Sequence, residues 1–162
     1  MPVSRTMWLR GINIDAAKMK RNARDERDAR TKNISALWKN GIKFLVEEND
    51  KMQAEHRIAN DEANRVINTF TKPPLYMGPP AGVDKSVWLK NFNVYMKGLR
   101  DQQRITNEQN IKEVSLRWKE GYRALKDANN SMTKENEATF HREIAEIDAM
   151  TKSQIAQGPP KD

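Results

Sequence analysis

The sequence predicts an all-α protein made of two tandem units of about 80 residues each. Trp38-Lys39-Asn40-Gly41 returns 80 positions later as Trp118-Lys119-Glu120-Gly121. Aligning residues 1–80 with 81–160 without a gap pairs all four tryptophans. Proline is absent from residues 3–72 and 81–158, and no alternating strand pattern occurs. We interpret the repeat as a tandem duplication of a helical unit.

The first helix of each unit is expected to run from the first tryptophan, over about residues 8–27 in the first copy. Its pattern is clearer in the second copy, where Trp88, Phe92, Tyr95, Met96 and Leu99 recur at helical spacing. Such a stripe is typical of one apolar helix face. We therefore expect the first helix to bury this stripe in the core of its unit.

The second helix has a start signal and a stop signal. Thr106 to Gln109 fits a capping box, in which the side chain of the Thr cap and that of the Gln three residues later satisfy free backbone N–H groups. Gly41 and Gly121 follow the Trp-Lys pairs at equivalent positions. Glycine is the expected residue just past a helix end. The sequence therefore predicts that both second helices end at these glycines.

The third helix is expected over residues 42–71 and 122–151, where Leu45 and Met52 repeat as Leu125 and Met132. Prolines should then stop the helix and stiffen a linker. The predicted organisation is a first repeat over 1–72, a Pro-rich linker over 73–80, a second repeat over 81–156 and a tail over 157–162. Each unit would hold a short, a second short and a long helix.

The composition is that of a highly charged chain with a modest core. The 162 residues carry a net charge of +7, with an isoelectric point near 9.7 and a mean hydropathy of −0.91. Residues 1–80 hold 15 Lys and Arg against 10 Asp and Glu, whereas residues 81–162 hold 14 against 12. The first unit therefore carries most of the surplus, in a run that is either a solvated helix face or a phosphate-facing surface.

The sequence has no signature of catalysis, of a cofactor or of a metal. There is no cysteine, and His56 and His141 stand without another His or Cys at ligand spacing. No glycine-rich phosphate loop occurs. We expect that the protein is not an enzyme. The four tryptophans are expected to anchor the core, because each lies on the apolar stripe of its helix: Trp8, Trp38, Trp88 and Trp118.

The spacing of aromatic residues resembles that of the high-mobility-group (HMG) box family. Trp88 and Phe92 stand where that family has paired aromatics near the start of its first helix, and Trp118-Lys119 follows 30 residues after Trp88. Two such boxes in tandem are similar to the mitochondrial DNA-packaging members of the family. The resemblance implies three-helix boxes that bend or coat DNA. The phosphate contacts would come from Lys18, Lys20, Arg21, Arg24, Arg27 and Arg30 in the first unit, and from Lys97, Arg100 and Arg104 in the second.

Two functions remain open from the sequence. The first is a non-catalytic structural or accessory subunit that binds other protein subunits of a large assembly, either a mitochondrial complex or a virion interior. Small units with mixed-charge faces and eight methionines favour it, since methionine adapts to irregular contacts. The alternative is a tandem HMG-box-like architectural DNA-binding protein. We expect an intracellular location, on the mitochondrial matrix side or in a virion, and no transmembrane segment.

Overall fold

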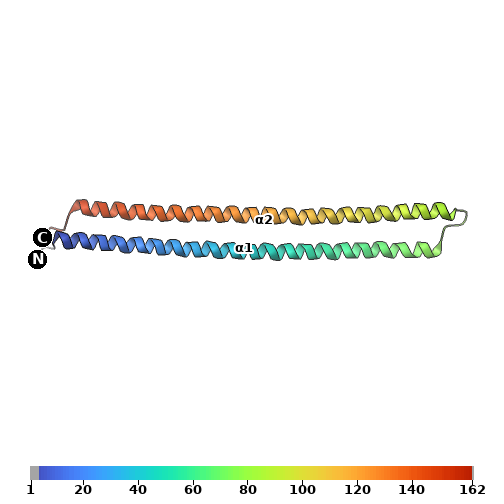
Figure 1. Cartoon of the computed structure of the whole chain (residues 1–162), viewed down its shortest axis with the longest axis horizontal. Helices are drawn as coiled ribbons and strands as arrows, with labels where there is room; N and C mark the ends of the chain where they lie inside the picture. The colour runs from blue at the N-terminus through green and yellow to red at the C-terminus, as the bar shows by residue number, and fades with distance from the viewer. Residues whose placement is uncertain (1–3, 162) are drawn as a thin grey trace. The chain divides into compact units, whose positions relative to one another are not determined.

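Two helices make up nearly all of the protein. The computed structural model describes residues 4–161, apart from the side chains of residues 73 and 76. Helix α1 spans Arg5–Met77 and helix α2 spans Lys85–Gln157, with a turn between them (Figure 1). Among the described residues there is no β-strand. The all-α class predicted from the sequence is therefore confirmed.

The helices form two compact units that cross the boundaries of the repeats. Unit 1 comprises Met1–Ile42 and Ala124–Asp162, and unit 2 comprises Lys43–Arg123. Each unit is an antiparallel helix pair, and unit 2 also contains the turn between α1 and α2. Because the repeat length is 80, each unit combines the first part of one repeat with the second part of the other.

The side chains between the helices follow an 11-residue repeat. In both helices the residues that are not exposed recur at spacings of four, four and three, as in Trp88, Phe92, Met96 and Leu99. Spacings of this kind average about 3.67 residues per turn, which favours a straight or slightly right-handed helix pair over a left-handed coiled coil. The same spacing begins at Trp8 in α1. The period therefore keeps one face of each helix against its partner.

The prediction that helices end at Gly41 and Gly121 was wrong. Both residues lie inside unbroken helices, and neither has a positive φ. A Cβ atom on Gly41 would lie 2.6 Å from Leu125 Cδ1 in unit 1, and a Cβ on Gly121 would lie 2.6 Å from Leu45 Cδ2 in unit 2. The glycines therefore allow a leucine of the other helix to approach the backbone closely. As a result, each repeat contains a single long helix in place of the expected three.

The helices end instead at the Gly-Pro-Pro sequences. Gly78 has a φ of 71° and Gly158 a φ of 78°, the left-handed conformation expected of a glycine just past a helix. The Gly78 N–H donates to the carbonyl of Pro74 at 3.1 Å. Helix α1 thus runs past the expected stop at residue 73. At the other end of the turn, the Asp84 side chain accepts a hydrogen bond from the Ser86 N–H and caps α2.

The predicted capping box at Thr106 was also wrong. The Thr106 hydroxyl donates to the carbonyl of Gln102, one turn earlier in α2, at 3.0 Å. A threonine inside a helix can satisfy its hydroxyl in this way without ending the helix. The sequence pattern of a helix start therefore occurs in the interior of α2.

The interior of the helix pairs is thin. Of the described residues, only five are buried: Ala16, Ala23, Met96, Val114 and Asn136. Among the same described residues, twenty large hydrophobic side chains are exposed. Much of the apolar surface of each helix pair therefore has no cover within its own unit.

Candidate functional site

A polar cluster holds the two helices of unit 1 together. Asn136 of α2 is 5% exposed and accepts a hydrogen bond from Arg30 Nε at 2.7 Å. Its amide nitrogen donates to Thr31 Oγ1 at 3.1 Å and to the Arg27 carbonyl at 3.4 Å. Arg30 also lies 3.9 Å from a Glu143 carboxylate oxygen. A buried asparagine with these partners fixes the register of the helices, since a shift would leave its amide unsatisfied.

Three of the predicted phosphate contacts are engaged between the helices of unit 1. Besides Arg30, the guanidinium of Arg27 lies 4.3 Å from the ring centre of Phe140, a cation–π distance. Lys20 Nζ lies 2.7 Å from an Asp148 carboxylate oxygen. These side chains therefore contribute to helix pairing, and carboxylates of α2 partly neutralise the charges of Lys20 and Arg30.

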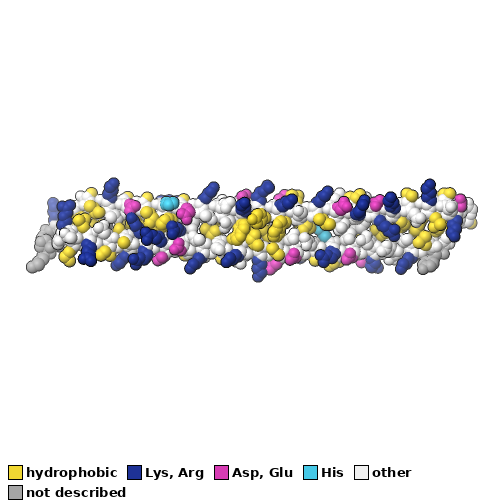
Figure 2. Space-filling view, in the orientation of Figure 1, with side chains coloured by type: hydrophobic (Ala, Val, Ile, Leu, Met, Phe, Trp, Pro, Cys, Tyr) yellow, Lys and Arg dark blue, Asp and Glu magenta, His cyan; other side chains and the backbone are white. Residues whose placement is uncertain are grey.

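The other predicted phosphate contacts are exposed. Lys18, Arg21 and Arg24 form no salt bridge with any residue that the structure describes, and the same holds for Lys97 and Arg100. Arg104 lies 3.9 Å from Asp101 on its own helix. Lys and Arg side chains are interspersed with Asp and Glu on the face in Figure 2. The surface in that view is therefore of mixed charge rather than uniformly basic.

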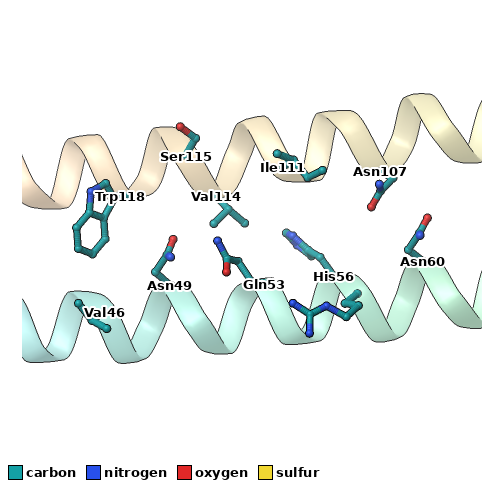
Figure 3. Close-up of a pocket in the computed structure, with 11 residues that line it drawn as sticks. Val46, Asn49, Gln53, His56, Asn60, Asn107, Ile111, Val114, Ser115 and Trp118 are labelled. Carbon is teal, nitrogen blue, oxygen red and sulfur yellow. The ribbon is translucent and has the colours of Figure 1, made fainter.

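A cavity of about 600 Å³ lies between the helices of unit 2 (Figure 3). From α1, Asn49, Gln53 and His56 reach toward α2, and from α2, Val114 and Trp118 reach toward α1. His56 Nδ1 is buried and has no hydrogen-bond partner among the described residues. The cavity has a mixed lining, in which amide side chains such as Asn49 and Gln53 alternate with apolar ones such as Val114 and Trp118.

The cavity of unit 2 corresponds to the polar cluster of unit 1 through the repeat. His56 occupies the repeat position of Asn136, and Asn110 that of Arg30. The inter-helix stripe is thus polar at the same level in both units. In unit 1 this position holds the buried amide of Asn136 with its hydrogen-bond partners, whereas in unit 2 it holds the imidazole of His56 beside a cavity.

Unit 2 also carries an apolar groove of about 720 Å³. Its sides are formed by residues near the end of α1 and the start of α2. Three of them are hydrophobic side chains with large exposed fractions: Val66 at 38%, Phe70 at 64% and Tyr95 at 64%. Exposed rings and methyl groups that lie together in one groove are typical of a surface that contacts another molecule.

The tryptophans predicted to anchor the core all lie on the inter-helix stripe. Trp8 and Trp38 of α1 and Trp88 and Trp118 of α2 are half-buried. Trp88 stacks on Phe92 with ring centres 5.8 Å apart. A two-helix unit has no third element to cover the outer edge of each ring, so part of every indole stays in water.

One exposed ion pair changes the pKa values of its members. Arg65 donates hydrogen bonds to both carboxylate oxygens of Glu62, at 3.0 and 2.6 Å. These bonds, and then the positive charge, lower the pKa of Glu62 below its usual range. The carboxylate in turn raises the pKa of Arg65. The Glu62–Arg65 pair lies on the exposed side of α1 and does not connect α1 to α2.

Neither metal chemistry nor similarity to known proteins assigns a site. The described residues contain no group of three or more His, Cys, Asp or Glu side chains that could hold a metal ion. Within the same residues, neither helix has a stretch apolar enough to cross a membrane. The chain matches no family model, no curated protein and no solved structure. The fold and its surfaces are therefore the basis for any functional proposal.

Sequence reasoning missed the groove of unit 2. Val66, Phe70 and Tyr95 lie on two predicted helices of different repeats, so no local pattern joins them. The available signal was the 11-residue spacing, which would have predicted two long helices and the pairing of the end of one repeat with the start of the next.

Proposed function

We propose that the protein is a non-catalytic helical subunit that binds within a larger macromolecular assembly. The observation that carries this proposal is the imbalance between five buried residues and twenty exposed large hydrophobic side chains among the described residues. Single exposed hydrophobic residues are ordinary, but a helix must bury its apolar stripe against another element, and larger exposed apolar surfaces mark contacts with other molecules. The exposed side chains are then covered by the neighbours in the assembly.

Purification of the tagged full chain from its native source, after mild cross-linking, tests this proposal. The expected result is a fixed set of protein subunits in constant ratio to the chain. Recovery of the chain with no other macromolecule, at low and at moderate salt, would refute the structural role. A matched bait with Phe44→Glu, which changes an exposed side chain of unit 2, should lose subunits that contact this unit, since a charge cannot be buried without a partner.

DNA binding is the second candidate function, and the exposed basic side chains of α1 favour it. Lys18, Arg21 and Arg24 are free to meet phosphates, whereas Lys20, Arg27 and Arg30 would have to leave partners in α2. A mobility-shift assay on random duplex tests it. Binding that weakens steeply between about 50 and 200 mM salt would support it, because released counterions drive such binding.

The matched variants for this assay neutralise equal numbers of charges. Replacing Lys18, Arg21 and Arg24 by glutamine should weaken binding strongly and reduce the slope with salt. The control replaces Lys39, Lys43 and Lys51, which are also exposed on α1. Equal losses in both variants would mean that only net charge matters. No shift at low salt would exclude DNA binding.

A further inference from the structure

We propose that the apolar groove of unit 2 binds the same groove of a second copy of this chain, so that the two chains form a symmetric dimer. This inference deepens the proposed structural role and rests on it. The groove is lined by the exposed Val66, Phe70 and Tyr95 together with half-buried or buried side chains such as Phe92 and Met96. A dimer of this kind uses one patch twice, because each copy presents to its partner the surface that it also receives.

The duplication supplies an internal comparison for this groove. Unit 1 has a groove of about 290 Å³ that shares most of these repeat positions, although the equivalents of Phe92, Tyr95 and Met96 do not line it. There, Glu143 and Glu146 of unit 1 replace Ala63 and Val66 of unit 2. Met150 replaces Phe70 at the next turn. The groove of unit 1 is thus lined by acidic side chains, whereas that of unit 2 has aromatic side chains in contact with solvent.

The absence of charge in the groove favours a second copy over a foreign partner. The chain carries a net charge of +7, which opposes the association of two copies in general. Every residue that lines the groove of unit 2 is neutral. Two such grooves can meet without like charges facing each other, whereas foreign partners are usually steered and selected by complementary charges at the rim. The groove of unit 1 could not pair with itself, because its glutamates would face each other.

The exposed rings are large enough for a weak dimer. A phenylalanine or tyrosine buries about 150–250 Å² when fully covered. At 64% exposure, Phe70 and Tyr95 each offer about 100–160 Å² for burial. The four rings of two copies therefore supply about 400–640 Å², roughly a third to a half of the 1,200 Å² at which specific interfaces begin. The dimer is accordingly expected to be weak.

Sedimentation velocity of the full chain over a concentration series measures this association. We expect a monomer–dimer equilibrium that Phe70→Glu weakens by about 10-fold or more, since the charge would be buried at the centre of the contact. The control is Met150→Glu, at the equivalent position of unit 1, which is 50% exposed and should leave the equilibrium unchanged. Both changes lie on exposed side chains, so helix content by circular dichroism should remain that of the wild type.

Single-cysteine variants give a second readout, because the natural chain has no cysteine. Gln102→Cys lies in the groove of unit 2, and Asn22→Cys lies at the equivalent position of unit 1. A flexible bis-maleimide reagent should link two copies of the first variant much faster than two copies of the second, whereas a direct disulfide would need the two-fold axis to pass close to residue 102. A chain that stays monomeric up to about 100 μM, or equal cross-linking at both positions, would overturn the dimer. Such a result leaves the structural role standing if the native chain still co-purifies with fixed subunits.

Discussion

Replacing Gly41 by alanine tests whether this glycine serves the close approach of the helices. In a helix interior alanine is favoured over glycine by about 1 kcal/mol. At position 41 the added Cβ would lie 2.6 Å from Leu125 Cδ1 and 3.0 Å from Leu125 Cδ2. Forcing a packed side chain to move costs about 1–3 kcal/mol. We therefore expect Gly41→Ala to change the free energy of unfolding by between about 0 and −2 kcal/mol.

The matched control is Gly11→Ala in the same helix and the same unit. No atom lies within 4 Å of a Cβ built at Gly11, and its φ is not positive. The higher helix propensity of alanine is therefore not offset by a steric clash at this position, and Gly11→Ala should raise the free energy of unfolding by about 1 kcal/mol. Urea unfolding followed by far-UV circular dichroism measures both variants under the same conditions.

A double-mutant cycle with Leu125→Ala separates the steric explanation from a helix end at Gly41. Once the leucine methyl groups are gone, Gly41→Ala should become stabilising, with a coupling energy of about 1–3 kcal/mol. A helix end with a strained φ would not be relieved by a change in the other helix. The close approach is refuted if Gly41→Ala stabilises as much as Gly11→Ala, or if it still destabilises in the Leu125→Ala background.

Three further changes test other parts of the structure. Asn136→Ala should lower the free energy of unfolding by about 1–3 kcal/mol, because Arg30 loses its buried acceptor. The control Asn130→Ala, on the exposed side of α2, should leave the free energy of unfolding nearly unchanged. Chemical unfolding measures both variants. Trp118→Ala should lower the free energy of unfolding by about 2 kcal/mol, less than the loss of a fully buried tryptophan, because the ring is half-buried. An unchanged midpoint of chemical unfolding would contradict the position of Trp118 between the helices. The pKa of Glu62, followed by NMR, should lie below its usual range and should rise in an Arg65→Gln variant. Because the pKa of Glu62 is lower in the folded than in the unfolded state, the ion pair stabilises the fold at neutral pH. This contribution is lost as the pH falls through the folded-state pKa.

The division of the chain into compact units is the feature that alters the interpretation of the duplication most. A repeat in sequence suggests a repeat that folds by itself. Here the helix of one repeat instead packs against the helix of the other, as shown by Gly41 against Leu125 in unit 1 and Gly121 against Leu45 in unit 2. These are the same two repeat positions with the roles of the helices exchanged. The pairing is therefore self-complementary, as expected if the single repeat once paired with an identical helix.

The HMG resemblance rests on spacings that two long helices also satisfy. Trp88, Phe92 and Trp118 all lie on the 11-residue stripe of α2. The same aromatic pattern therefore fits a three-helix box or a helix that runs through Gly121. The two folds are distinguished by the environment of the glycine. A glycine just past a helix end has a positive φ, whereas a glycine at a helix contact leaves space for a side chain of the other helix.

The sequence by itself determined the helical class, the 80-residue repeat pattern with its paired tryptophans and the absence of cysteine. These follow from composition and from spacings along one chain, which need no knowledge of a partner. The expected helix ends at residues 71 and 151 were too early, since α1 runs to Met77 and α2 to Gln157, and each helix is followed by Gly-Pro-Pro.

Only the tertiary structure decided the role of Gly41 and Gly121, the use of Lys20, Arg27 and Arg30 between helices, and the difference between the two grooves. Each depends on which residue lies opposite across the helix pair, and that neighbour is about 80–130 residues away in the chain. A glycine or an arginine has the same local pattern in either setting. Its physical role is fixed only when a leucine methyl group or a buried amide from the other helix lies against it.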